Sequence, residues 1–320
     1  MNRNVLSRRV LVGVAVAALA LAGCSNDSDS GDSTGGESEL SGAVLVDGSS
    51  TVAPLSEAAA SIYQEEQSKV NVSVGTSGTG GGFEKFCKGE TDISDASRPI
   101  KDEEKAACDA AGVGFVEMIV ANDALTVVVN KANTWAKCLT VDQLKKVWEP
   151  SSKVSSWNQI DPSFPNEPLK LFGPGTDSGT FDYFTAEING EEGASRADYT
   201  ASEQDNVLVQ GVSGEKGAMG YFGFTYYEEN ADKLQAVQVD GGAGCVAPSK
   251  KSAQDNTYKP LSRPLFIYVS KKGTEKPQVL AFVEFYVQNI DEIVTEAKYV
   301  PLTEQQKGTL ASEFESLKSS

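Results

Sequence analysis

Three times along this chain, a short apolar run meets a turn of small residues and a helical pattern follows. The turns occupy residues 47–51, 75–82 and 173–180, and each is rich in Ser, Thr and Gly. This alternation of strand, turn and helix predicts an α/β fold with a Ser or Thr capping each helix. Free amide groups at a helix start favour an anion, so three such turns together predict a cradle for an oxyanion. Ordinary capping is the alternative explanation for any one turn taken alone.

A fourth segment, residues 92–100, carries the charge that the three turns lack. It is typical of a strand ending in Arg98, with Asp95 and Ser97 on one face. Because Arg98 precedes a proline, its backbone should be extended, and its guanidinium can donate two parallel hydrogen bonds to an oxyanion. A surface arginine is the alternative. We assign Arg263, which also precedes a proline, to structure.

The N-terminus has the pattern of an export signal. Three arginines and no acidic residue precede an apolar run at residues 10–21, which is too short for an ordinary membrane span. The run ends in Leu-Ala-Gly followed by Cys24, a pattern typical of a bacterial lipobox. We therefore predict a signal peptide at 1–23 and lipidation of Cys24. A plain cleaved signal with an incidental cysteine is the alternative.

Residues 24–41 should form a flexible acidic tether, because they contain too few apolar side chains to offset the entropy of ordering. The remaining 42–320 are long enough for one large domain or two lobes. The chain carries 28 basic and 45 acidic residues, a net charge of −17 that falls to −20 once the signal and its three arginines are removed. This charge argues against nucleic acid as a partner, and any anion site must be built from local donors.

Four cysteines remain after Cys24, and an even number in an exported chain indicates two disulfides. Three pairings are possible, and we favour Cys87 with Cys108 and Cys138 with Cys245. The chain has no histidine, which removes His-dependent triads and the commonest zinc ligand. No pair of cysteines has CxxC spacing, so we expect no metal site. Together with the absence of histidine, this leads us to expect no cofactor and no enzymatic activity.

The ordered set of motifs resembles the phosphate-binding component of high-affinity phosphate ABC transporters, the PstS type. Besides the turns, the resemblance covers residues 139–144, Trp148 and residues 156–160, 217–223 and 258–265. It implies a two-lobed α/β periplasmic-binding-protein fold of type II with the ligand cleft between the lobes. The lobes would be 42–123 with 261–320, and 124–260, and the strands crossing between them would lie at 125–129 and 265–269.

The resemblance also assigns roles by position. It implies a phosphate site formed by Ser50, Thr51, Ser77, Ser97, Arg98, Ser178, Gly179 and Thr180. Two positions depart from the family. Pro174 stands where much of the family has an arginine, and Ser97 stands where much of it has an aspartate. Arg98 is expected to restore the cation, and Asp95 or Asp177 to accept the proton that phosphate carries near pH 7 and sulfate lacks.

The function implied is that of a monomeric, lipid-anchored receptor on the outer face of the cell membrane or in the periplasm. It would capture inorganic phosphate by hinge closure and deliver it to ABC permease subunits. Its only contact with the membrane would be the lipid. The alternatives are a binding protein for sulfate or molybdate, an envelope phosphatase and an adhesion protein. The missing histidine and nucleophile elbow argue against the phosphatase, and adhesion would not require three oxyanion turns.

Overall fold

The computed structural model describes residues 40–176 and 178–319. The predicted signal peptide, Cys24, nearly all of the tether and Asp177 lie outside the described residues. The described chain is a mixed α/β protein with one large sheet and one small sheet. In chain order, the strands are β1 (Gly42–Gly48), β2 (Val70–Gly75), β3 (Ile93–Ala96), β4 (Phe115–Asn130), β5 (Cys138–Thr140), β6 (Lys170–Gly173), β7 (Thr200–Ala201), β8 (Ala218–Gly223), β9 (Leu234–Ala236), β10 (Gln238–Asp240), β11 (Cys245–Val246) and β12 (Ser262–Ser270).

The helices cover both faces of the large sheet. They are α1 (Ala53–Glu66), α2 (Gly78–Cys87), α3 (Asp102–Ala110), α4 (Val141–Trp148), α5 (Trp157–Ile160), α6 (Gly179–Phe184), η1 (Thr185–Asn189), α7 (Asp205–Gly214), α8 (Phe224–Glu229), α9 (Lys250–Gln254), η2 (Gly273–Glu275), α10 (Pro277–Gln288), α11 (Ile290–Glu296) and α12 (Glu304–Lys318).

The large sheet has the order β2-β1-β3-β12-β4-β8-β6-β7, with β9 also paired to β4. The β1–β2, β1–β3, β6–β8 and β6–β7 pairs are parallel, whereas β12 and β4 are antiparallel to their neighbours. Parallel β1, β2 and β6 each lead into a turn and a helix. This arrangement places the three Ser-, Thr- and Gly-rich turns at the carboxyl ends of strands, where ligands bind in open α/β sheets.

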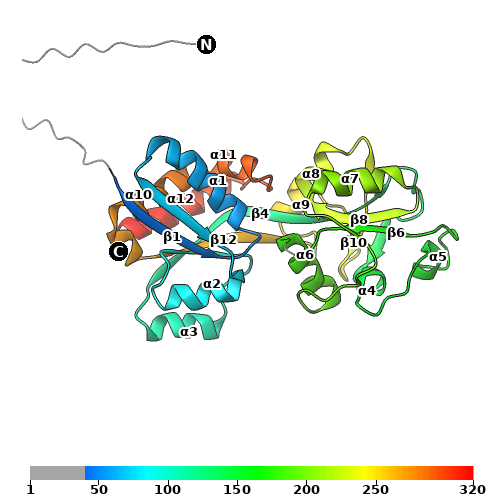
Figure 1. Cartoon of the computed structure of the whole chain (residues 1–320), viewed down its shortest axis with the longest axis horizontal. Coiled ribbons are helices and arrows are strands. Elements are labelled where there is room, and N and C mark those ends of the chain that lie inside the picture. Colours follow the sequence, from blue (N-terminus) through cyan, green and yellow to red (C-terminus); the bar gives the residue numbers. More distant parts are fainter. Residues whose placement is uncertain (1–39, 177, 320) are drawn as a thin grey trace, which may run out of the picture. The chain divides into compact units, whose positions relative to one another are not determined.

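Two large hydrophobic cores, each with a smaller cluster beside it, divide the described chain, and we call the elements packed on each large core a lobe. The first core joins β1, β4 and β12 to α1, α10, α11 and α12, while Phe83 and Phe86 of α2 pack on the opposite face of the same strands. The second core surrounds Trp148, Trp157 and Tyr221, which are fully buried. Figure 1 shows the helices of the first lobe on both sides of its strands.

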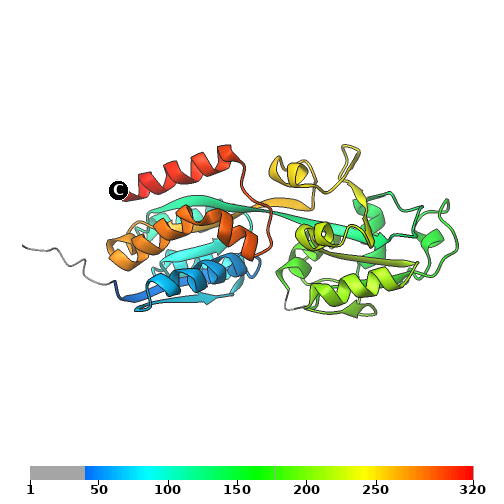
Figure 2. The same ribbon diagram turned by 90° about the horizontal axis from the view of Figure 1, so that it is seen from above.

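Only β4 and β12 of the large sheet pass from one lobe to the other, as both views show (Figures 1 and 2). Within β4, Val120 and Ala121 belong to the first core, while Ala124 and Leu125 belong to the second. The apolar, β-branched runs predicted to cross between lobes are therefore buried parts of these two strands.

The two predicted disulfides are confirmed: Cys87 is bonded to Cys108, and Cys138 to Cys245. The first joins α2 to the end of α3 in the first lobe. The second joins β5 to β11 across the small sheet, whose order is β11-β10-β5. Each disulfide thus lies within one lobe, and neither ties together the two bodies that the proposed mechanism needs to move.

Candidate functional site: a cleft between two lobes

A cavity of about 1400 Å³ lies between the lobes and is lined by loops from both. Six of the eight predicted ligand residues line it: Ser50, Thr51, Ser77, Ser97, Arg98 and Gly179. Ser178 and Thr180 instead line an adjoining cavity of about 500 Å³, which shares Ser50, Thr51 and Gly179 with the first. The larger cavity exceeds the usual size of a pocket for a small ligand, so a single small anion would contact all its walls only after the cleft narrows.

The first turn brings Thr51 to the junction of the lobes. Its Oγ1 donates to the carbonyl of Gly179 in the second lobe at 3.3 Å. The amide of Thr51 donates to Ser49 Oγ at 3.2 Å, and its carbonyl accepts from Tyr299 at 2.6 Å. The expectation of a Ser or Thr cap is wrong here: Val52 is the N-cap of α1 and offers no side-chain oxygen. The hydroxyls of Ser49 and Thr51 instead bond within the turn and to Gly179 across the cleft.

The second turn presents Ser77 to the cleft, but its hydroxyl already has a partner. Ser77 Oγ donates to Asp47 Oδ1 at 2.5 Å, and the Ser77 amide donates to the same oxygen at 3.0 Å. Lys85 pairs with the other oxygen of Asp47. Although burial opposes it, these bonds hold the pKa of Asp47 below its usual range. Ser77 occupies the N-cap position of α2 without a side-chain cap bond in the described structure, so the predicted capping is not formed.

The third turn has the predicted helix cap. Ser178 Oγ accepts from the Thr180 amide at 3.2 Å and so begins α6. Gly179 packs closely against the first turn: a Cβ built there would lie 2.5 Å from Thr51 Oγ1 and 2.7 Å from the Thr51 amide nitrogen. The first and third turns therefore lie so close together that only glycine fits at position 179.

The fourth segment differs from the prediction in two ways. β3 ends at Ala96, so Ser97 lies beyond the strand and does not share a strand face with Asp95. Ser97 instead lies against Thr79, whose Oγ1 is 3.1 Å from Ser97 Oγ and accepts from the Ser97 amide at 3.2 Å. The early end follows from Pro99, which disfavours continued ladder pairing in this part of the chain.

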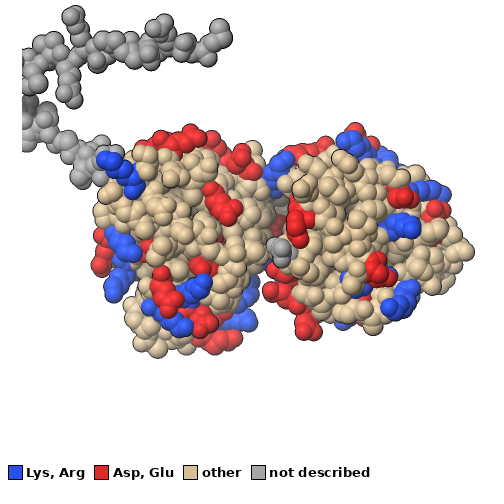
Figure 3. Space-filling view, viewed as in Figure 1, with Lys and Arg blue, Asp and Glu red and all other residues tan. Residues whose placement is uncertain are grey.

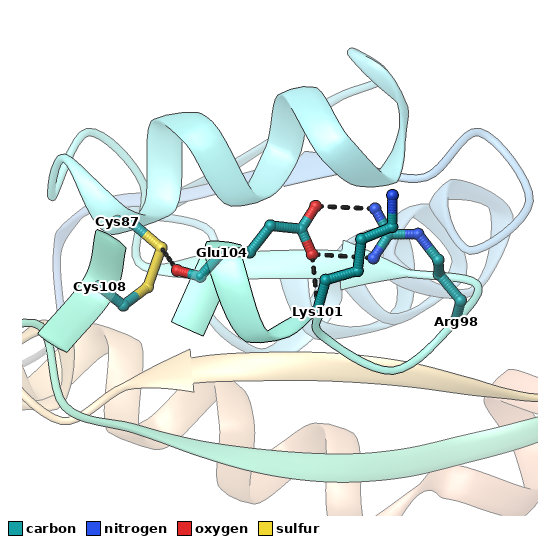
Figure 4. Close-up of a disulfide and its surroundings, with 5 residues drawn as sticks. All are labelled: Cys87, Arg98, Lys101, Glu104 and Cys108. Carbon is teal, nitrogen blue, oxygen red and sulfur yellow. Dashed lines mark hydrogen bonds and ion pairs between the residues drawn. A yellow bond between two sulfur atoms is a disulfide. The ribbon is translucent and has the colours of Figure 1, made fainter. Parts of the chain in front are cut away.

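Arg98 lines the cavity, but its charge is already paired. Its two terminal nitrogens donate to the two carboxylate oxygens of Glu104 at 2.8 and 2.7 Å, as Figure 4 shows. Glu104 also accepts from the Lys101 amide at 2.9 Å and so caps α3. The bond from Glu104 raises the pKa of Arg98, although burial opposes it. This arrangement fits Arg98 as a support of the first lobe better than as the cation for a ligand.

Asp95 is fully buried and does not line the cavity. Its Oδ1 accepts from Ser56 at 2.9 Å, while its Oδ2 has no hydrogen-bond partner in the described structure. Burial raises the pKa of Asp95 to about 8, with Asp47 and Glu57 adding to the effect. The carboxyl is therefore mostly protonated at neutral pH, which makes it a poor proton acceptor in this conformation. The other predicted acceptor, Asp177, lies outside the described residues.

Arg263, which the sequence analysis assigns to structure, makes structural contacts and also lies in the cleft. Arg263 lines the main cavity at the start of β12, and its NH2 group donates to Thr51 Oγ1 at 3.0 Å. It is the cross-strand neighbour of Asp123 on β4. The sequence marks Arg263 only by its place before Pro264 in the segment 258–265, and its partner Asp123 lies 140 residues away.

Asp182 is a second cavity residue that the sequence analysis missed. It lies in the first turn of α6, and its carboxylate has no hydrogen bond or ion pair among the described residues. Burial raises its pKa to about 6, with Glu192 adding to the effect and Arg263 opposing it. Asp182 is therefore mostly ionised at neutral pH, and its oxygens can accept a proton from a ligand in the cleft.

Nothing in the described residues suggests a metal centre or a membrane span. They hold no group of three or more His, Cys, Asp and Glu side chains placed to bind a metal ion. None of their helices is both long and apolar enough to cross a bilayer. On the face drawn in Figure 3, acidic and basic side chains are interspersed, and no broad basic area lies there.

A two-lobed α/β fold with donor-rich turns converging on the cleft defines a solute-binding protein. A family model described as "PBP superfamily domain" matches residues 33–289. The chain therefore belongs to the PBP superfamily, within the family of phosphate-binding substrate-binding proteins of ABC transporters, and this family is one of binding proteins and not of enzymes.

Individual relatives fall in the same family. The chain is 40% identical to the phosphate-binding protein PstS of Staphylococcus saprophyticus, over 91% of each chain. It is 47% identical to protein SphX of Synechocystis sp., over 84% of this chain and 81% of the relative. Among solved structures, "a possible phosphate binding protein" from Planctomyces limnophilus is 47% identical, with a TM-score of 0.83 over 87% of this chain and 99% of that one. The predicted family and fold class are thus confirmed.

Proposed function

We propose that this protein is a lipid-anchored receptor that binds inorganic phosphate in the cleft and delivers it to an ABC permease. The observation that carries the proposal is the convergence of the first and third turns, where Thr51 of one lobe contacts Gly179 of the other at 3.3 Å. Hydroxyl and amide donors from both lobes thereby face one cavity, and such donors suit a compact oxyanion.

The proposed lobes are 42–123 with 261–320, and 124–260, joined through β4 and β12. The proposed donors are Ser50, Thr51, Ser77, Ser97, Ser178, Gly179 and Thr180. Ser77 would have to share its hydroxyl between Asp47 and the ligand, or exchange one for the other on closure. A hinge motion that narrows the cleft would bring the remaining donors onto the anion and create the closed form for the permease to recognise.

Affinity in the micromolar range or below requires about 8 kcal/mol or more. A hydrogen bond to a charged group contributes about 1.5–3 kcal/mol, so four to six such bonds in a closed cleft suffice after the cost of ordering. The cleft can supply that number from its turns alone. A net charge of −17 on the whole chain makes these local donors necessary, because the overall field of the protein repels the ligand.

The test is calorimetry of the purified mature protein with phosphate, arsenate, sulfate and molybdate. We expect tight binding of phosphate and arsenate, which both carry a proton near neutral pH, and binding of sulfate at least 100-fold weaker. A preference for sulfate or molybdate would replace the ligand in this proposal. Absence of binding by all four anions would refute it.

The anchor needs a separate test because Cys24 lies outside the described residues. Its support is the basic, apolar and small-residue pattern of residues 1–24. Replacing Cys24 with Ser should release the protein into the medium or leave an unprocessed precursor, as followed by membrane fractionation and mass. A Ser variant that stays processed and membrane-bound would contradict lipidation. Size-exclusion chromatography with light scattering would test the proposed monomer.

A further inference from the structure

Arg263 lies where the two crossing strands leave the first core. In the register of the β12–β4 pair, Arg263 is opposite Asp123, and its Nε is 3.4 Å from Asp123 Oδ2. Both side chains are largely buried, with 15% and 11% of their surfaces exposed. Backbone pairing with β4 fixes this position, so the guanidinium is anchored to a strand that passes between the lobes.

Three further segments meet the same guanidinium. NH2 donates to Thr51 Oγ1 in the first turn at 3.0 Å, and NH1 donates to the Ser97 carbonyl at 3.4 Å. The ring of Tyr183, in the helix that follows the third turn, lies 3.5 Å from the guanidinium carbon. Arg263 thus contacts the first turn, the fourth segment and α6, which are the loops proposed to bind the ligand.

The guanidinium still has donors to offer. An arginine has five N–H groups, and the three bonds above leave one on each terminal nitrogen. Stacking on Tyr183 fixes the plane of the group, which lowers the entropy lost when it binds a second partner. A planar pair of N–H groups matches two oxygens of a tetrahedral oxyanion.

Arg263 and Arg98 differ in how closely a carboxylate pairs with each guanidinium. Arg98 makes a two-pronged pair with Glu104 at 2.7 and 2.8 Å, whereas Arg263 has one contact of 3.4 Å with Asp123. Asp123 therefore orients Arg263 through Nε and leaves both terminal nitrogens to other partners. Arg263 also contacts Thr51 of the first turn, and Thr51 in turn contacts Gly179 of the third turn.

We infer that Arg263 is the cation that binds the oxyanion, reaching the ligand from a crossing strand and not from the third turn or the fourth segment. Asp123 and Tyr183 act as positioning residues that hold the guanidinium in place. This assignment rests on the proposed function, since it names the charged group of that same site. Because the charge lies on the hinge, it contacts the anion without depending on either lobe to carry it into the cleft.

The test is calorimetric titration of the mature protein with inorganic phosphate, for wild type and for variants at Arg263. Arg263→Ala should weaken binding by about 30-fold or more, and Arg263→Lys should recover only part of that loss because an ammonium lacks the planar pair of donors. Arg98→Ala should weaken binding less than Arg263→Ala does. Lys250→Gln, which removes one positive charge from a surface pair with Glu228, is the control for net charge.

Removing Arg263 alone leaves Asp123 buried without its partner, so the double variant Arg263→Gln with Asp123→Asn removes both charges together. Thermal unfolding of each variant reports whether it is folded. If the folded double variant and Arg263→Ala bind phosphate within threefold of wild type, the assignment is overturned while the proposed function stands. If wild type itself binds no phosphate, the proposed function fails and this assignment fails with it.

Discussion

A methyl group added at Gly179 should impair phosphate binding without harming the fold. The Cβ of an alanine there would lie 2.5 Å from Thr51 Oγ1, 2.7 Å from the Thr51 amide nitrogen and 2.9 Å from Ser50 Oγ. Ordinary contacts begin near 3.5 Å, so the first and third turns must separate by about 1 Å. Rotation of the Thr51 side chain cannot relieve the clash with its backbone nitrogen.

The magnitude follows from the bonds that such a separation breaks. Losing one hydrogen bond to a charged ligand costs about 1.5–3 kcal/mol, which corresponds to about 10- to 100-fold in affinity. The fold should be unaffected or slightly more stable, because Gly179 has an ordinary backbone conformation at the start of α6 and alanine reduces the freedom of the unfolded chain by about 0.4–1 kcal/mol.

The assay is calorimetry with phosphate together with thermal unfolding of the free protein. Gly214→Ala is the matched control, since Gly214 ends α7 in the same lobe and a Cβ there meets no atom within 4 Å. We expect weaker binding with an unchanged or higher Tm for Gly179→Ala, and wild-type affinity for Gly214→Ala. Wild-type affinity of Gly179→Ala would show that the two turns do not have to approach each other to bind the ligand.

Three other perturbations follow from buried or cross-linked groups. Burial raises the pKa of Asp95 to about 8, so this carboxyl contributes stability at low pH that is lost as the pH rises from about 4 through 8. Asp95→Asn should therefore reduce the difference in the free energy of unfolding between pH 5 and pH 8.5, measured by urea titration. An equal difference for wild type and variant would contradict this prediction. Replacing Cys138 and Cys245 with Ala opens a loop of 107 residues and should cost about 2–5 kcal/mol, seen as a lower Tm, whereas an unchanged Tm would mean that the small sheet holds without its disulfide. Asp182→Asn should reduce the preference for phosphate over sulfate at least tenfold if its carboxylate accepts the ligand's proton, and an unchanged ratio would exclude that role.

Local sequence pattern made the strand–turn–helix junctions and the crossing strands predictable. The disulfides were predictable because four cysteines allow only three pairings. Composition and periodicity report which backbone segments form elements, and parallel strands bring their carboxyl ends to one edge. The structure therefore places residues of all three turns around one cavity, as the sequence indicates. The end of β3 was misplaced by two residues, since the proline that limits pairing acts before its own position.

The partners of the charged side chains were not predictable in the same way. Arg98 and Glu104 are six residues apart, but their pairing depends on where α3 begins relative to β3. Arg263 and Asp123 are neighbours only because β12 and β4 pair in one particular register. A sequence with two Arg-Pro steps does not say that Arg98 makes two short bonds to a carboxylate whereas Arg263 makes one contact of 3.4 Å.

The order of strands in the large sheet has a consequence for how the chain acquires its structure. β12 lies between β3 and β4, although β4 ends at Asn130 and β12 begins only at Ser262. A polypeptide that emerges N-terminus first therefore exposes β1, β2 and β3 well before their central neighbour exists. The second lobe, whose strands follow one another in the interval, can assemble earlier. We expect maturation to run from the inserted lobe outward, with the N-terminal lobe completed last, and nascent chains that stop before residue 262 to remain protease-sensitive in β1–β3.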